Sequence, residues 1–318
     1  MMHVELIMAL RQVKGFEAKT LAGNIEAITK LKTENDAYLF LEELRQRHKR
    51  IETVSAQDFS MIISNINKIL NKQESLGIQT ITIDDNVYPE GFLHVDNKPL
   101  YFFAKGNLAA LKKRNIAIIG TRNVTDFSKE VGEHLGKYIA SKNWAITSGL
   151  AEGCDAAGHA GCIQAKGTAI AIVATPLNEI YPKSNTKLQQ DILDNGGCVI
   201  SEYHIGAATS RYNFIERDRL QCGLADGIAV IETGLKGGTW HAINGAIKLN
   251  KPVACYKFKD EYYQQYEHSL GNQKMIQNKT ADALYDADSI NRFLDKCARK
   301  NQSLANHDND VRQPLPLL

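Results

Sequence analysis

The residues best suited to binding phosphate begin at a glycine turn near the middle of the chain. Gly120, Thr121 and Arg122 follow the apolar run 116–119, and a segment with helical patterning comes next. Such a turn presents backbone N–H groups and the positive end of a helix to an anion. The guanidinium of Arg122 can close on a phosphate with two parallel hydrogen bonds. We therefore predict a phosphate site here, with an ordinary strand-to-helix turn and a surface arginine as the alternative.

Small residues after the predicted strand 144–147 let the backbone approach a ligand or a neighbouring loop. Ser148 and Gly149 open the segment Ser-Gly-Leu-Ala-Glu-Gly-Cys-Asp, which ends at Asp155. His159 lies four residues further on, so the two side chains are neighbours if the segment is helical. They form either a catalytic pair or, as the alternative, a helix cap beside a packed side chain.

A second cation and an amide follow the predicted strand 168–174. Lys183 and Asn185 belong to Tyr-Pro-Lys-Ser-Asn at 181–185, where a helix is expected to begin. Ligands of an open α/β sheet bind at the carboxyl ends of its strands. Lys183 is therefore predicted to lie at the same sheet edge as Arg122, as a further phosphate contact.

Basic and aromatic residues are interleaved in the segment 211–219. Arg211, Arg217 and Arg219 supply three positive charges, and Tyr212 and Phe214 supply two ring faces. Cations for phosphates beside aromatic faces for bases are typical of proteins that bind single-stranded nucleic acid. A solvated amphipathic helix is the alternative.

A last glycine turn follows the predicted strand 228–232. Gly237 and Gly238 precede a predicted helix, so they form a second possible anion cradle, and Thr239 adds a hydroxyl donor. Trp240 stacks on a base in one interpretation and fills the core in the other.

Short apolar segments alternate with helical segments through most of the chain, and these elements must position the site. Strands that are apolar throughout and separated by helices indicate a parallel sheet covered on both faces. We predict an α/β fold, a doubly wound, Rossmann-like and mostly parallel sheet. The expected strands are 78–83, 100–104, 116–120, 144–147, 168–174, 198–201, 228–232 and 253–256, and the expected helices between them are 127–142, 155–166, 184–195, 211–222 and 239–250.

Three parts are expected along the chain. Residues 1–75 contain no proline and show helical spacing of apolar residues, with a Gly15 turn typical of a SAM-like or helix-hairpin-helix-like domain. A helical interaction domain without a phosphate site is the alternative. Residues 76–298 form the sheet domain, and residues 299–318 form a polar tail.

Composition narrows the function classes. The 318 residues carry 38 Lys+Arg against 36 Asp+Glu, a net charge of +2, so any phosphate site must come from local clustering. The six cysteines show no two-residue spacing and the nine histidines are dispersed, so we expect no metal site and no redox pair. The first glycine turn lacks Gly-x-Gly-x-x-Gly, so no dinucleotide cofactor is expected. We see neither a signal peptide nor an apolar run of about 18 residues, so a cytoplasmic protein without a membrane span is expected.

The order of these motifs from about Gly77 to Asp286 resembles the DNA-processing protein A family (DprA, also called Smf). The resemblance is carried by Tyr88-Pro89, by Gly120-Thr121-Arg122, by the segment 148–155, by Tyr181-Pro182-Lys183-Ser184-Asn185, by Ser201-Glu202-Tyr203 and by Arg217-Asp218-Arg219.

The resemblance implies a non-enzymatic protein that binds and protects single-stranded DNA. It also implies a dimer or larger assembly that helps to load the RecA recombinase during DNA uptake and recombination. Arg122 and Lys183 are similar in position to the family's phosphate-binding residues, and Arg217 and Arg219 to its Arg-Asn-Arg segment. The chain departs from that pattern at Asp218, which replaces the asparagine, so it resembles a divergent member.

Two other functions remain open from the sequence. The Gly237-Gly238-Thr239 turn looks like part of the loop of phosphoribohydrolase-like enzymes, which suggests a nucleotide-binding sensor or a nucleotide hydrolase with Glu202 and Glu232 as acidic candidates. The third possibility is a protein-interaction scaffold in a DNA-damage, competence or defence pathway.

Overall fold

The computed structural model describes residues 3–311, with side chains described in that range except at 18 and 300–311. Within these residues the centre of the molecule is a nine-stranded sheet. All of the predicted strands are present, and a short ninth strand near the C-terminus is added. The strands are β1 (Ile78–Thr82), β2 (Tyr101–Gly106), β3 (Asn115–Ile119), β4 (Ala145–Ser148), β5 (Ala169–Ile172), β6 (Cys198–Ser201), β7 (Gly227–Val230), β8 (Val253–Tyr256) and β9 (Asp282–Leu284).

The strand order confirms the predicted doubly wound α/β fold. Across the sheet the order is β1-β2-β6-β5-β4-β3-β7-β8-β9. The pairs from β6 to β9 are parallel, whereas β1 and β2 join one edge as antiparallel strands. The chain winds from β3 to β6 in one direction, then returns to β7 and winds in the other. The carboxyl ends of β3 and β7 therefore flank the switch point, where open α/β sheets bind ligands.

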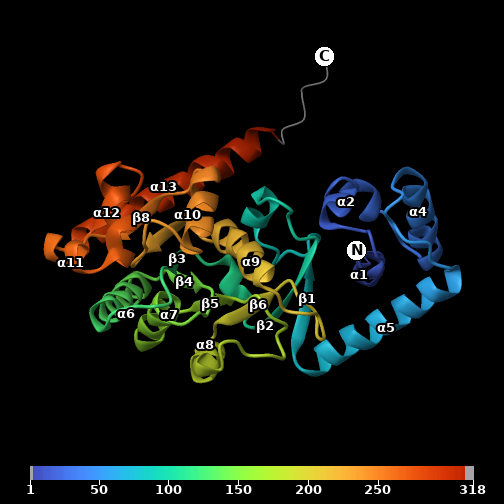
Figure 1. Ribbon diagram of the computed structural model, residues 1–318, viewed down its shortest axis with the longest axis horizontal. Coiled ribbons are helices and arrows are strands. Elements are labelled where there is room, and N and C mark those ends of the chain that lie inside the picture. Colours follow the sequence, from blue (N-terminus) through green and yellow to red (C-terminus); the bar gives the residue numbers. More distant parts are fainter. Residues whose placement is uncertain (1–2, 312–318) are drawn as a thin grey trace, which may run out of the picture.

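Helices cover both faces of the sheet, as the uninterrupted apolar strands require. Figure 1 shows α6, α7 and α8 on one side and α9 and α10 on the other. Strand β3 serves both layers, since Ile116 and Ile118 pack with the α6 side while Ala117 and Ile119 pack with the α10 side. These helices are α6 (Asp126–Ser141), α7 (Cys154–Gln164), α8 (Thr186–Asp194), α9 (Arg211–Leu224) and α10 (Thr239–Lys248), and short 3-10 helices occupy η1 (Glu90–His94), η2 (Leu108–Lys112) and η3 (Lys183–Asn185).

The N-terminal residues form five helices, as their periodicity predicts, while the expected domain boundary at residue 75 stays a prediction. Thr33 and Ser55 cap the two longest helices by accepting hydrogen bonds from the backbone N–H three residues on. The bundle contacts the sheet domain through Gln73, whose side-chain oxygen accepts a hydrogen bond from the Ile205 N–H at 2.9 Å. The helices are α1 (Val4–Gln12), α2 (Ala18–Ala22), α3 (Ile25–Ile28), α4 (Glu34–Arg47) and α5 (Ala56–Ser75).

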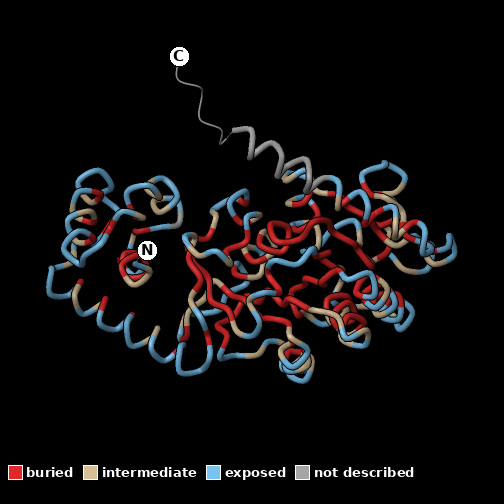
Figure 2. The backbone as a smooth tube through the Cα atoms, turned by 180° about the vertical axis from the view of Figure 1, so that it is seen from behind, coloured by how far each residue is buried: buried red, intermediate tan, exposed pale blue. Residues whose placement is uncertain are grey.

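The turn at Gly15 packs against the backbone of Arg50 and Ile51. Gly15 has φ +86°, and a Cβ there would lie 2.0 Å from the carbonyl oxygen of Arg50. Figure 2 shows buried backbone in α1 as well as across the sheet.

The C-terminal part holds elements that the sequence did not predict. They are α11 (Asp260–Gln265), η4 (Glu267–Ser269), α12 (Leu270–Gln277) and α13 (Ala287–Val311). The expected tail over 299–318 is helical as far as Val311, because no proline or glycine interrupts that stretch; residues 312–318 lie outside the described residues. In the described chain, no helix has the length and apolarity to cross a bilayer.

Candidate nucleic-acid interface

The main pocket lies at the switch point of the sheet and has a volume of about 520 Å³. Its lining includes the end of β3 and the loop after it, the loop after β7, part of α9 and the start of α10. The residues that line it include Gly120, Thr121, Arg122, Asp155, Phe214, Arg217, Asp218, Gln221, Lys236, Gly237, Gly238, Thr239, His241 and His268.

The loop after β3 has the form that the sequence predicts. The Thr121 N–H donates to the Glu232 carbonyl oxygen at 2.8 Å, which ties this loop to the end of β7. Gly120 is required for this close approach, because a Cβ there would lie 2.4 Å from the Cys154 Sγ and 2.7 Å from that same carbonyl oxygen. The loop therefore brings the exposed Arg122 side chain to the pocket wall.

Arg122 lies beside two aromatic rings at the rim. Its guanidinium carbon is 5.4 Å from the centre of the Phe214 ring, and the Phe214 and Tyr181 rings meet edge to face at 5.5 Å. Arg122, Phe214 and Tyr181 also line a second, smaller pocket next to the first. Tyr181 is 51% exposed. Sequence reasoning did not include it among the stacking residues, although the Tyr-Pro turn after a strand marked its position.

Arg217 forms part of the pocket wall but is largely buried, with 5% exposure. Its Nη1 donates to the Ile172 carbonyl oxygen at 2.7 Å, and its Nε lies 3.2 Å from the Asp218 Oδ1. Gly149 leaves the room for this side chain, because a Cβ at Gly149 would lie 1.5 Å from the Arg217 Nη1. Burial raises the pKa of Asp218 to about 6, against the opposing effect of Arg217.

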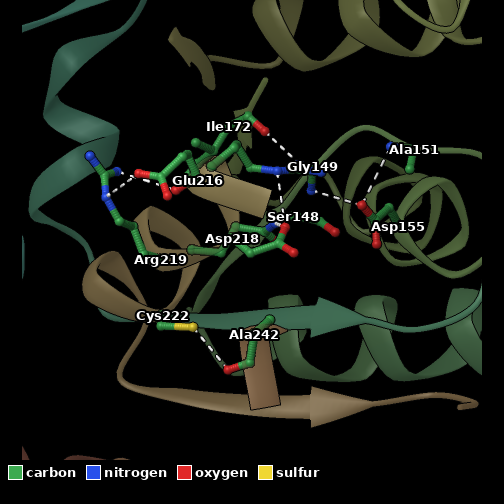
Figure 3. Close-up of polar contacts among 12 residues, drawn as sticks. Ser148, Gly149, Ala151, Asp155, Ile172, Glu216, Asp218, Arg219, Cys222 and Ala242 are labelled. Carbon is green, nitrogen blue, oxygen red and sulfur yellow. Dashed lines mark hydrogen bonds and ion pairs between the residues drawn. The ribbon is translucent and has the colours of Figure 1, made fainter. Parts of the chain in front are cut away.

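The structure separates Arg219 from the pocket. Its guanidinium donates to both Glu202 carboxylate oxygens at 2.7 and 2.8 Å and to the Asn97 carbonyl oxygen at 2.8 Å. Figure 3 shows Arg219 directed away from Asp218 and Gly149. Residues two apart on a helix point about 200° apart, which is the reason that Arg217 and Arg219 do not share a surface. The predicted cluster of both arginines in one groove is therefore wrong.

Some of the other predicted residues of α9 line the pockets and others do not. Arg211 and Tyr212 are exposed on the first turn of the helix, and neither is among the residues that line the two pockets. Phe214 reaches both pockets. Of the two aromatic side chains predicted in this segment, Phe214 alone is brought to Arg122.

The end of β4 and η3 hold Ser148 and Asn185 in structural contacts. The Ser148 Oγ donates to the Ile118 carbonyl oxygen at 2.6 Å, and the side chain is buried. The Asn185 Nδ2 donates to the Leu150 carbonyl oxygen at 2.9 Å. Lys183 is exposed and follows Pro182, which lines the smaller pocket, so it lies near the rim rather than in the main pocket.

The turn before α10 contributes Gly237, Gly238 and Thr239 to the pocket, as the sequence predicts. Gly237 has φ +134°, a backbone conformation that side chains disfavour. Trp240 is held differently, since its Nε1 donates to the Gly234 carbonyl oxygen at 2.8 Å and its ring packs against the core. Trp240 therefore fixes the turn and is not brought to the pocket.

Asp155 and His159 do not form a pair. The Asp155 Oδ2 accepts hydrogen bonds from the N–H groups of Gly149 at 3.0 Å and Ala151 at 3.4 Å, so it caps the turn that precedes α7. Neither ring nitrogen of the fully buried His159 has a hydrogen-bond partner among the described residues, and burial lowers its pKa to about 3. The structural alternative is confirmed at this position.

Comparison with known proteins places the pocket in context. A family model described as DNA recombination-mediator protein A matches residues 79–295, a segment that includes every residue lining the main pocket. The chain belongs to this family. It is 33% identical over 224 residues to the DNA processing protein DprA of Bacillus subtilis, a match that covers 70% of this chain and 73% of that protein. The predicted resemblance to the DprA family is confirmed.

Solved structures of DprA proteins share the fold. A DprA structure from Streptococcus pneumoniae superposes with a TM-score of 0.70 at 23% identity, over 90% of this chain and 95% of that one. A DprA structure from Helicobacter pylori, described for its single-stranded DNA binding mode, gives a TM-score of 0.61 at 26% identity, over 68% of this chain and 96% of that one.

Proposed function

We propose that this chain binds single-stranded DNA across the switch-point pocket. The observation that carries the proposal is the exposed guanidinium of Arg122, 5.4 Å from the Phe214 ring at the mouth of the pocket. A positive group that contacts phosphate beside an aromatic face that stacks on a base is the combination that single-strand binding requires. The H. pylori relative, whose structure is described for single-stranded DNA binding, supports the same ligand.

The charges around the pocket support a strand whose phosphates follow the rim. Arg122 and Lys236 are exposed and both line the main pocket, and the exposed Lys183 follows Pro182, which lines the smaller pocket. The turn before α10 adds backbone N–H groups at a helix N-terminus. The bulk charge of only +2 does not drive binding, so affinity comes from these few contacts and falls with salt.

Family membership extends the proposal. We infer a non-enzymatic role in which the chain protects single-stranded DNA and assists loading of the RecA recombinase during DNA uptake and recombination. A homodimer and a cytoplasmic location belong to the same proposal. The nucleotide-hydrolase alternative names two acidic residues. Glu202 pairs with Arg219, whereas the buried Glu232 accepts a hydrogen bond from Tyr262 at 2.9 Å on Oε1 and has no partner for Oε2 among the described residues.

The test is a fluorescence anisotropy titration of labelled single-stranded and duplex DNA at two salt concentrations. We expect tighter binding of the single strand, weakened by salt and by Arg122→Ala. Arg47→Ala serves as the matched control, because it removes one exposed positive charge on α4, away from the pocket. Equal binding by wild type and Arg122→Ala, or a preference for duplex DNA, would overturn the proposal.

A further inference from the structure

A groove lined by aromatic side chains lies between the start of α6 and α11. This aromatic groove has a volume of about 560 Å³, and the residues that line it include Val124, Thr125, Asp126, Phe127, Tyr262 and Tyr266. Figure 1 shows α6 and α11 at the end of the molecule opposite the N-terminal helices. None of these residues lines the main pocket or the smaller one.

Three aromatic rings line the groove and contact one another. The centre of the Tyr262 ring lies 5.7 Å from that of Phe127 and 4.5 Å from that of Tyr266. Phe127 is 47% exposed, and the other two side chains are half-buried. Aromatic surface that solvent can reach offers a stacking face to a base, whichever base it is.

Tyr262 is held in position by both its ring and its hydroxyl. The buried Phe258 stacks on the ring, with centres 4.2 Å and planes 8° apart. The hydroxyl donates to the Glu232 Oε1 at 2.9 Å and lies 2.7 Å from the hydroxyl oxygens of Thr125 and Ser128. Because the ring is already fixed, a ligand that stacks on it loses little free energy to ordering the side chain.

Two segments of the chain line both the main pocket and the aromatic groove. In the loop after β3, Arg122 lines the pocket and Val124 lines the groove. Two residues of chain span at most about 7 Å, roughly two nucleotides at the spacing of about 3.4 Å between stacked bases. Likewise His268 lines the pocket and Tyr266 the groove, and their ring centres are 5.6 Å apart. A strand that contacts Arg122 is therefore within about two nucleotides of the groove.

The charges beside the groove are mixed, with more acids than lysines. In the segments 126–130 and 256–268 the exposed acidic residues are Asp126, Glu130, Asp260, Glu261 and Glu267, and the exposed lysines are Lys129, Lys257 and Lys259. Phosphates gain nothing from such a surface. A strand in the groove is therefore held by its bases, and this part of the affinity does not depend on salt.

We propose that the bound strand continues from Arg122 into the aromatic groove, where its bases stack on Phe127, Tyr262 and Tyr266. This inference rests on the proposed function and adds a second binding surface outside the switch-point pocket. Stacking accepts any base, so the groove has no sequence preference. It adds affinity only to strands that are long enough to reach it.

The experiment uses the full chain and oligothymidylates of about 4 to about 16 nucleotides, the range of site sizes for single-strand binding by OB folds. In anisotropy titrations, Tyr266→Ala and Phe127→Ala should bind the shortest strand with wild-type affinity. Each should bind the longest strand about tenfold more weakly, the effect of one lost stacking contact. The slope of log affinity against log salt should stay at the wild-type value, unlike that of Arg122→Ala.

Two control variants isolate the stacking face. Tyr266→Phe keeps the ring and loses only the hydroxyl, so it should bind every strand like wild type. Tyr285→Ala removes a ring that is 56% exposed and lines neither the groove nor the main pocket, so it should also bind like wild type. Circular dichroism verifies the folds, and light scattering after size-exclusion chromatography gives the oligomeric state of each variant.

The outcomes separate this inference from the proposed function. Failure of the wild-type chain to bind any strand overturns both. Wild-type affinity of both alanine variants for the longest strand overturns the inference and leaves the proposed function standing. An equal loss for short and long strands, or a lowered salt slope, also overturns it, because the rings would then act on the main pocket or on phosphates.

Two further results count against stacking in the groove. A loss in Tyr266→Phe as large as that in Tyr266→Ala assigns the effect to the hydroxyl and overturns the inference. A changed oligomeric state in either alanine variant assigns the groove to contact between copies of this chain and overturns it as well.

Discussion

Arg219 gives the sharpest contrast between a DNA contact and a structural ion pair. Its side chain is 17% exposed, and that of its partner Glu202 is 14% exposed. The two side chains share two hydrogen bonds, at 2.7 and 2.8 Å. Arg219→Ala removes both, together with the hydrogen bond to the Asn97 carbonyl oxygen, and leaves the Glu202 carboxylate without its main partner.

The size of the stability loss expected for Arg219→Ala follows from the burial of the ion pair. Removing one partner of a buried pair costs about 3–5 kcal/mol, whereas an exposed pair contributes about 0–1 kcal/mol. Since little of either side chain is exposed, we expect the free energy of unfolding to fall by about 3 kcal/mol when Arg219 is replaced by alanine. The affinity of the folded variant for single-stranded DNA should stay at the wild-type value.

The assay pairs urea denaturation, followed by far-ultraviolet circular dichroism, with anisotropy titration under native conditions. Arg211→Ala is the control, because it removes an exposed arginine from the first turn of the same helix. We expect Arg211→Ala to unfold like wild type. Arg219→Ala with wild-type stability and lost DNA affinity would refute the reasoning, because the arginine would then act on the DNA rather than on Glu202.

Three further predictions follow from the pocket. Arg122→Ala should weaken DNA binding about 30-fold, which corresponds to the loss of about 2 kcal/mol for a charged hydrogen bond. In titrations at several salt concentrations, the variant should also lower the slope of log affinity against log salt by about 0.7. Unchanged affinity counts against the phosphate contact. Gly149→Ala should lower the melting temperature in calorimetry, because its Cβ would lie 1.5 Å from the Arg217 Nη1, and an unaltered transition would mean that this arginine can move freely. The pKa of Asp218 is raised to about 6 in the folded chain, so the stability that the protonated side chain contributes is lost as pH rises from about 4 to 6. Asp218→Asn should flatten this part of the profile of stability against pH, measured by urea unfolding. A profile as steep as that of wild type would disprove the assignment.

The fold was predictable because the apolar strands and intervening helices are long enough to show their periods. The run ending at Ile119 appears as β3, and the helix expected at 211–222 appears as α9. Strand β9 was missed because three residues, Asp282–Leu284, are too few to establish a pattern. The antiparallel partners β1 and β2 were found as strands, but their place beside β6 depends on contacts distant in sequence.

The site was predictable only in part. Arg122 and the turn at Gly237 come together because both follow strands that meet at the switch point. The local sequence Arg-Asp-Arg, in contrast, suggested one basic cluster, whereas the helical rotation sends Arg217 inward and Arg219 to Glu202. The exposed Tyr181 ring becomes a candidate only when its contact with Phe214 is known.

The measurement that tests the central claim most directly is photo-cross-linking of the full chain to an oligothymidylate carrying one 5-iodouracil. After irradiation, peptide mass spectrometry locates the attached residue. If the strand crosses the switch-point pocket, the cross-links should fall on Phe214 or Tyr181, the rings beside Arg122. Cross-links confined to peptides from the N-terminal helices α4 and α5, with none at either ring, would contradict the account.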